Sequence, residues 1–289
     1  MTPVEAQLLV QALVNGVMLG MVYILVALGL TLVFSIMEVI NFAHGEFYML
    51  GGFTAYYLFA QLGINYLVTL AAAAVLVGLL GFLLEKVIFR PFRGNLLGAF
   101  IVSLGLVWIL QSGALVAFGT LEKSVPSPFR GTLKILGVYF SLERLAVTLI
   151  GITLVMALYV FIRFSKQGRA IRAVAQDSDA AALQGINVNR ISSQAFALGS
   201  ALAAAAGALI GPIFFVSPFM GGLPILKAFI IIILGGMGSI PGALLGGLIL
   251  GIAEGVGSIF LSVPGVNLLG FVIVIAVLLL RPRGLLGHA

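Results

Sequence analysis

The feature that most constrains this chain is a succession of long apolar segments separated by short polar links. We place these segments at residues 8–36, 43–62, 66–89, 97–119, 145–163, 191–215, 222–236, 241–261 and 265–280. A helix needs about 20 apolar residues to cross a bilayer, because every backbone polar group must be hydrogen-bonded within the chain there. The pattern therefore predicts an all-α polytopic membrane protein with about eight or nine transmembrane helices, some of them broken or re-entrant. Residues 8–36 are long enough to be tilted or broken, with Asn15, Gly16 and Gly20 as candidate break points.

The composition excludes the main classes of soluble protein. Charged residues make up only 8% of the 289 residues, whereas an average soluble domain carries about 25%. The chain therefore lacks the polar surface of a soluble enzyme or a nucleic-acid-binding domain, and its hydrophobic fraction of 62% rules out a disordered chain. We expect a single transmembrane domain over residues 1–289 that contacts membrane lipid and binds no nucleic acid.

The residue types that carry most enzyme chemistry are scarce. The chain has no cysteine and only two histidines, so it offers no thiolate ligand and no multi-histidine metal site. It also lacks a G-x-x-x-x-G-K-[ST] loop and therefore cannot bind ATP in that way. We expect a transporter or channel subunit with no catalytic residue, no metal and no cofactor of its own.

Basic residues gather in three links and predict which helix ends face the cytoplasm. They lie at residues 86–93, 163–190 and 281–283. The positive-inside rule places all three links in the cytoplasm. An even number of crossings must then separate Arg190 from Arg281. This requirement predicts that the chain reverses at the glycine-rich stretch 235–242, which gives four crossings.

Three polar side chains follow the first apolar segment closely: Asn41, His44 and Glu46. Polar groups at membrane depth usually face a cavity or a partner, because exposing them to lipid is unfavourable. One interpretation is a re-entrant or broken-helix element beside a translocation path. The other is a short interfacial loop in which His44 and Glu46 satisfy helix ends.

The stretch 235–242 contains a second group of candidates for the translocation path. Glycine removes side-chain bulk and Pro241 cannot continue the hydrogen-bond ladder, so a helix that enters this stretch must end. Broken helices in transporters expose backbone groups to substrate. The candidates to line the path are Gly235, Gly236, Gly238 and Ser239. For the glycines that follow, among them Gly247, Gly251 and Gly255, we favour close helix packing.

Two isolated charges lie in the C-terminal apolar segments. Glu254 lies deep in its segment, where it either faces the translocation path or is buried with a hydrogen-bond partner. We favour burial. Lys227 lies near a segment end, from which its long side chain can reach the interface.

The link 168–185 predicts a short exposed helix. Asp177 suits the N-cap of the alanine-rich helix that follows it, and Gly185 suits its C-terminal end. Arg169 and Arg172 are three residues apart and therefore share a helix face. The short helix is either a docking element for a cytoplasmic partner or a solvated segment that lies on lipid headgroups.

Together these segments resemble one family along nearly the whole chain. The similarity is carried by residues 29–51, Arg90-Pro91, and residues 168–187, 227–229, 234–243 and 246–254. On these strings the chain resembles the LivH-type permease subunits of bacterial ABC importers for branched-chain amino acids. The resemblance implies a permease of the bacterial inner membrane that moves hydrophobic amino acids into the cytoplasm. The alternatives are a permease of the same family for other amino acids, urea or short amides, and an ATP-independent channel or facilitator.

The resemblance also implies partners and a docking motif. Such permeases pair with a second, related permease, are driven by two cytoplasmic ATPase subunits and receive substrate from a periplasmic or lipid-anchored binding protein. The docking motif is written E-A-A-x-x-x-G, and residues 179–185 match its spacing with Asp in place of Glu. The residues expected to couple to the ATPases are Arg169, Arg172, Asp177, Asp179, Ala180, Ala181 and Gly185.

Overall fold

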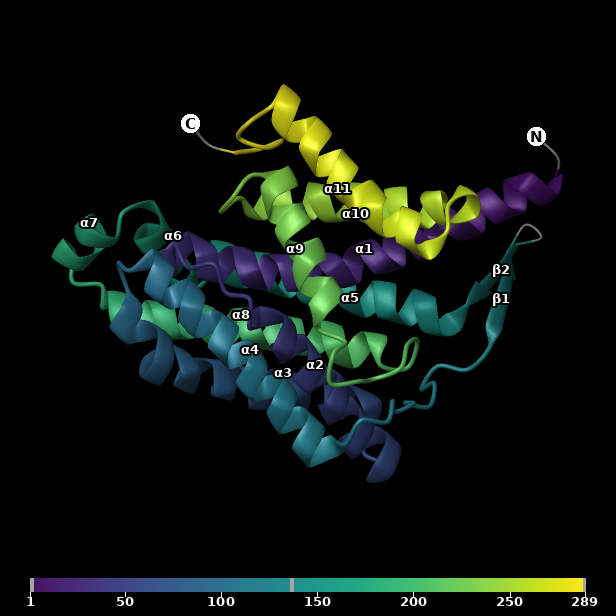
Figure 1. Ribbon diagram of the computed structural model, residues 1–289, viewed down its shortest axis with the longest axis horizontal. Coiled ribbons are helices and arrows are strands. Elements are labelled where there is room, and N and C mark those ends of the chain that lie inside the picture. Colours follow the sequence, from purple (N-terminus) through teal and green to yellow (C-terminus); the bar gives the residue numbers. More distant parts are fainter. Residues whose placement is uncertain (1–2, 136–137, 288–289) are drawn as a thin grey trace.

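The computed structural model describes residues 3–135 and 138–287, and most of these residues are helical (Figure 1). In chain order the helices are α1 (Pro3–Met37), α2 (His44–Ala55), α3 (Tyr66–Leu84), α4 (Leu96–Phe118), α5 (Leu142–Phe164), α6 (Lys166–Gln176), α7 (Ser178–Leu183), α8 (Val188–Ile210), α9 (Gly222–Gly235), α10 (Ile240–Phe260) and α11 (Val263–Leu280). A small antiparallel hairpin of β1 (Thr132–Ile135) and β2 (Val138–Ser141) precedes α5. The predicted all-α polytopic architecture is confirmed, and the hairpin is an addition that the apolar pattern did not predict.

Seven helices in the described part of the chain are long and apolar enough to cross a membrane, namely α1, α3, α4, α5, α8, α10 and α11. The shorter helices α2 and α9 have 12 and 14 residues, whereas a full crossing needs about 20. They lie in the segments 43–62 and 222–236, so each of the predicted apolar segments corresponds to a helix. A π-helical turn continues α2 over Tyr56–Gln61, and another continues α3 over Glu85–Phe89.

Helix α1 is unbroken over its 35 residues, so the predicted break at Asn15, Gly16 or Gly20 is wrong. These glycines serve close packing instead. A Cβ on Gly16 would lie 2.6 Å from Gly251 O, and a Cβ on Gly20 would lie 2.9 Å from Gly247 O. The backbones of α1 and α10 therefore touch directly, as glycines at four-residue spacing allow. The packing interpretation of the glycines in α10 is confirmed.

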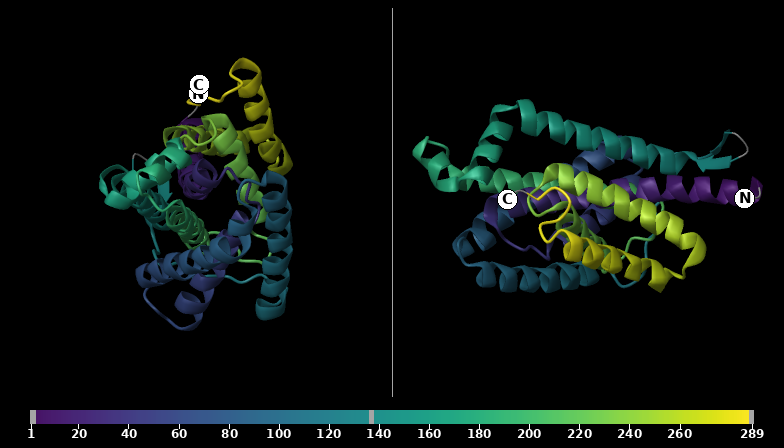
Figure 2. Two further views of the ribbon diagram at one scale, coloured as in Figure 1. Left: turned by 90° about the vertical axis from the view of Figure 1, so that its left-hand side faces the viewer. Right: turned by 90° about the horizontal axis from the view of Figure 1, so that it is seen from above.

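The helices form two similar halves that run in opposite directions (Figures 1 and 2). In one half α1 packs on α10 and on the short α9; in the other, α8 packs on α3 and on the short α2. The halves meet where Gly29 touches Gly199 and Gly45 touches Gly221, because a Cβ on any of these four would lie within 2.6 Å of its partner's carbonyl oxygen. Inverted halves that meet at short helices are typical of transporters.

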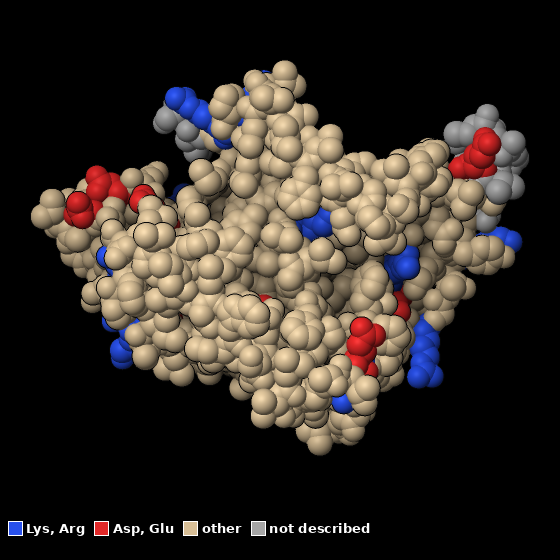
Figure 3. All heavy atoms as spheres, in the orientation of Figure 1, with Lys and Arg blue, Asp and Glu red and all other residues tan. Residues whose placement is uncertain are grey.

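One end of the bundle carries α6, α7, the α9–α10 turn and the segment after α11, and the other carries the β hairpin and the start of α1 (Figure 2). Helix α9 ends at Gly235 and α10 begins at Ile240, which confirms the predicted reversal. Four helices therefore connect Arg190 to Arg281. Between the ends, the face drawn in Figure 3 is mostly uncharged. Large apolar side chains such as Trp108 are exposed in the structure, as contact with lipid or with a partner subunit requires.

Candidate functional site

The link between α5 and α8 folds as two short helices with the predicted caps. Asp177 separates α6 from α7, and its Oδ1 accepts hydrogen bonds from Asp179 N and Ala180 N, each at 2.9 Å. Gly185 follows α7 with φ +80°, a conformation that glycine adopts without strain. The capping roles predicted for Asp177 and Gly185 are confirmed.

The exposed face of α7 differs from the prediction at one residue. Asp179 and Ala180 are exposed, and Leu183 at the end of the helix is 88% exposed. Ala181 is only 5% exposed and belongs to the main hydrophobic core. The side chain of Ala181 therefore faces inward and anchors α7, and the coupling role expected for this residue stays a prediction. Leu183 is the large apolar group that α7 presents.

The two arginines of α6 hold the end of α5. Arg169 Nη1 donates a hydrogen bond to Phe164 O at 3.2 Å, and Arg172 Nη2 donates one to Arg163 O at 3.3 Å. The last carbonyls of a helix have no partner within it, so these guanidinium groups satisfy them. Helices α5 and α6 are therefore tied together as one unit.

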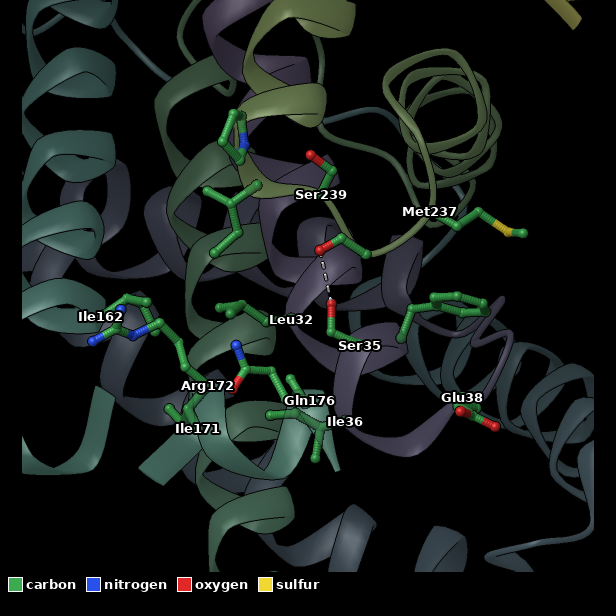
Figure 4. Close-up of a pocket in the computed structure, with 15 residues that line it drawn as sticks. Leu32, Ser35, Ile36, Glu38, Ile162, Ile171, Arg172, Gln176, Met237 and Ser239 are labelled. Carbon is green, nitrogen blue, oxygen red and sulfur yellow. Dashed lines mark hydrogen bonds between the residues drawn. The ribbon is translucent and has the colours of Figure 1, made fainter. Parts of the chain in front are cut away.

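A cavity of about 490 Å³ lies where α1, α6 and the α9–α10 turn meet (Figure 4). Its polar lining includes Ser35 and Glu38 from the end of α1, and Arg172 and Gln176 from α6. Ser35 Oγ donates a hydrogen bond to Gly238 O at 3.3 Å, and Figure 4 shows Gln176 beside the same space. The cavity thus connects the exposed α6–α7 unit to the turn between α9 and α10.

The four candidates in the turn have different roles. Gly238 and Ser239 line the cavity, whereas Gly235 and Gly236 do not. A Cβ on Gly235 would lie 2.2 Å from Gly242 O, so Gly235 permits the tight packing of α9 on α10. Gly236 has φ +103°, which a residue with a Cβ rarely adopts. Gly235 and Gly236 therefore serve packing and turn geometry here, and the translocation role predicted for them stays a prediction.

Asn41, His44 and Glu46 lie inside the bundle, with exposed fractions of 0%, 0% and 2%. His44 Nε2 lies 3.1 Å from Val26 O, and Glu46 Oε1 accepts a hydrogen bond from Gln111 Nε2 at 2.9 Å. The interpretation of this motif as an interfacial loop is therefore wrong. None of the three lines the cavity beside α6.

Glu254 is buried in an ion pair that joins three helices. Its Oε1 lies 2.5 Å from Lys227 Nζ of α9, and its Oε2 accepts a hydrogen bond from Tyr23 OH of α1 at 3.1 Å. Lys227 is only 3% exposed, so the expectation that it reaches the interface is wrong. The favoured burial of Glu254 with a partner is confirmed. Tyr23 and Glu254 also border a second cavity, of about 590 Å³, toward the hairpin end.

Sequence reasoning missed Tyr23, Ser35 and Gln111. Each is a polar residue within an apolar segment, and such residues often mark functional contacts in membranes. Nothing in the sequence indicates which of them pair across helices.

These features define the class of the protein. It is a polytopic membrane transport subunit in which two short helices and buried polar groups lie between long spanning helices, and an exposed helical unit adjoins a cavity. The chain matches the model of the family described as the permease component of the branched-chain amino acid transport system over residues 12–280. It belongs to this family.

Individual proteins agree with this assignment. The high-affinity branched-chain amino acid transport system permease proteins LivH of Escherichia coli (strain K12) and BraD of Pseudomonas aeruginosa are each 38% identical to this chain. Both alignments cover 96% of this chain and 95% of the relative. The structure of PsaBC from Streptococcus pneumoniae in complex with Fab has a TM-score of 0.53 and covers 96% of this chain and 92% of that one. At 14% identity it supports the fold alone.

Proposed function

We propose that this chain is the transmembrane permease subunit of an ABC importer that moves branched-chain, hydrophobic amino acids across the bacterial inner membrane into the cytoplasm. The observation that carries the proposal is the similarity, over 96% of the chain, to permease proteins of branched-chain amino acid transport systems. The complex would also contain a second, related permease, two cytoplasmic ATPases and a periplasmic or lipid-anchored binding protein. ATP hydrolysis belongs to the ATPases, because this chain has no phosphate-binding loop.

The α6–α7 unit is the element that couples ATP hydrolysis to transport in this proposal. Helix α7 presents Asp179, Ala180 and Leu183 outward, as a helix that inserts into a groove on an ATPase does. Movement of α7 passes to α6, whose Arg172 and Gln176 line the cavity at the α9–α10 turn. Rocking of the helices then opens and closes the end of the translocation path that Gly238 and Ser239 border.

The docking role is tested by Leu183→Asp. The variant places a charge on the exposed apolar group of α7 without touching the core, so we expect it to lose ATPase binding while it still inserts in the membrane. Co-purification of the ATPases with the permease measures this loss. Leu121→Asp is the matched control, because Leu121 is 75% exposed in the link after α4 and lies outside the α6–α7 unit. Normal ATPase binding by Leu183→Asp would show that α7 is not the docking element.

The transport function is tested with the complete complex in proteoliposomes. We expect uptake of radiolabelled leucine, isoleucine or valine that requires both the binding protein and ATP. Uptake that persists without ATP and ATPases would assign the chain to the channels or facilitators. ATP-dependent uptake of urea or short amides in place of these amino acids would refute the substrate class.

A further inference from the structure

Three carboxylates are buried among the described residues: Glu46, Glu85 and Glu254, with exposed fractions of 2%, 0% and 4%. Burying a carboxylate without a compensating cation is strongly unfavourable. Glu254 pairs with Lys227. Glu85 pairs with both arginines that follow it at the end of α3. Two of the three buried anions therefore have a permanent cation supplied by the chain.

Glu46 differs from the other two. Its Oε1 accepts a hydrogen bond from the neutral amide of Gln111, and its Oε2 has no hydrogen-bond partner in the described structure. No lysine or arginine of the described chain lies within ion-pair distance of it. The described part of the bundle therefore contains one buried carboxylate oxygen, at the contact of α2 and α4, to which the chain supplies neither a hydrogen-bond donor nor a cation.

The surroundings of Glu46 are apolar. Met49 lies one turn further along α2, and Ala114 lies one turn beyond Gln111 on α4. Both belong to a small hydrophobic cluster with Phe53, against which Leu50 also packs. A cation bound at Glu46 would thus have aliphatic and aromatic side chains beside it, which matches a ligand with one ammonium group and a branched aliphatic chain.

Helix α4 covers this position and is only weakly attached to the bundle. Its main contacts are with α2 and with the end of α3. Gly94 and Gly119 flank it with φ +76° and +81°, and no atom lies near the Cβ position of either. Glycines in open space permit rotation of the backbone at both ends of a helix. Gln111 joins α4 to Glu46 of α2, and Ser103 of α4 lies 3.3 Å from Phe42 N and from Ile40 O in the link between α1 and α2.

We propose that Glu46 binds the α-ammonium group of the transported amino acid, with its aliphatic side chain against the Met49–Ala114 cluster, and that α4 moves away from α2 to admit it. This inference rests on the proposed import of amino acids and assigns the group that recognises them within the permease. The substrate supplies the counter-charge that the chain lacks at Glu46. Gln111 holds the carboxylate in place between transport events.

The first test is Glu46→Gln in the complete complex in proteoliposomes. The variant keeps the size and the hydrogen bond to Gln111 but removes the charge. We expect leucine uptake to fall about tenfold or more, since a hydrogen bond between charged groups is lost, while complex assembly and ATP hydrolysis are retained. Glu46→Asp should recover part of the uptake. Glu122→Gln, in an exposed loop, is the matched control and should transport as the wild type does.

The outcomes separate this inference from the proposed function. A wild-type complex that takes up none of leucine, isoleucine and valine refutes the proposed function itself. Wild-type uptake with equal uptake by an assembled Glu46→Gln complex refutes the ammonium site alone. If the Glu46→Gln complex does not assemble, the Glu46→Asp variant decides between the two roles. A purely structural role of Glu46 predicts wild-type uptake for any acidic variant that assembles. A role in substrate binding predicts a raised KM for uptake, because the shorter side chain displaces the carboxylate.

The second test concerns the movement of α4. The chain has no cysteine, and the rings of Phe53 and Phe118 stack with centroids 4.3 Å apart. We expect the double variant Phe53→Cys/Phe118→Cys to lose uptake when a reducible bifunctional thiol reagent cross-links it, because the cross-link ties α4 to α2, and to recover uptake on reduction. The baseline is the uptake of the same double variant before cross-linking, and the uptake of the two single variants should not change on the same treatment. Undiminished uptake by fully cross-linked permease would refute the movement of α4.

Discussion

Replacing Gly251 by alanine should destabilise the crossing of α1 and α10. A Cβ at this position would lie 2.4 Å from Gly20 Cα and 2.5 Å from Gly16 O, whereas nonbonded carbon atoms pack at about 3.5–4.0 Å. All the neighbouring atoms belong to backbone, so the helices must separate by about 1 Å along their contact. Overpacking of this kind costs about 1–3 kcal/mol. The higher helix propensity of alanine offsets at most about 1 kcal/mol of this destabilisation.

The matched control is Gly113→Ala in α4, where no atom lies within 4 Å of the Cβ position. That variant gains the propensity of alanine without a clash and should be as stable as the wild type or slightly more so. The assay is thermal unfolding of both variants in detergent, in which about 1 kcal/mol corresponds to a shift of about 2–4 °C. Gly251→Ala should unfold several degrees below Gly113→Ala. Equal midpoints would refute the conclusion that backbone contact between α1 and α10 stabilises the half of the bundle that these two helices form with α9.

Two further predictions follow from the buried ion pair and from the sidedness. Lys227→Met leaves Glu254 buried without its cation and should destabilise the permease by about 3–5 kcal/mol. The double variant Lys227→Met/Glu254→Gln should recover most of the thermal stability. A double variant that stays as unstable as Lys227→Met would contradict an ion-pair role. Ser178→Cys, the only thiol in such a variant, should be labelled by a membrane-impermeant maleimide only after the cells are opened, because the basic link that contains it faces the cytoplasm. Labelling in intact cells would show that the assigned topology is inverted.

Local chemistry explains why much of the secondary structure was predictable. The reversal at 235–242 followed from Pro241 and from the even number of crossings required between Arg190 and Arg281, and the chain does turn there. The cap at Asp177 depends only on its own oxygen and on backbone N–H groups within three residues. Such features are decided by near neighbours in the sequence, so the sequence reports them directly.

Glycine shows the limit of local reasoning. Gly16 and Gly20 predict a break when α1 is considered alone, because glycine weakens an isolated helix. In the folded chain they meet Gly251 and Gly247 of α10, and the packing of the two helices outweighs the local preference. Ala181 is a similar case, since its position in a docking pattern says nothing about which side of α7 faces the core.

The sequence by itself determined that this protein lies in a membrane, which apolar segments form its long helices, and that α7 is capped as a short separate helix. These properties follow from the length of apolar segments and from hydrogen bonds over a few residues. Only the tertiary structure decided which buried charges are paired. Lys227 reaches Glu254 across 27 positions and Gln111 reaches Glu46 across 65. The physical reason is that a buried charge is compensated only by a group that lies close to it in space. The packing of α1, α2, α4, α9 and α10 sets these distances, and a local sequence pattern does not contain them.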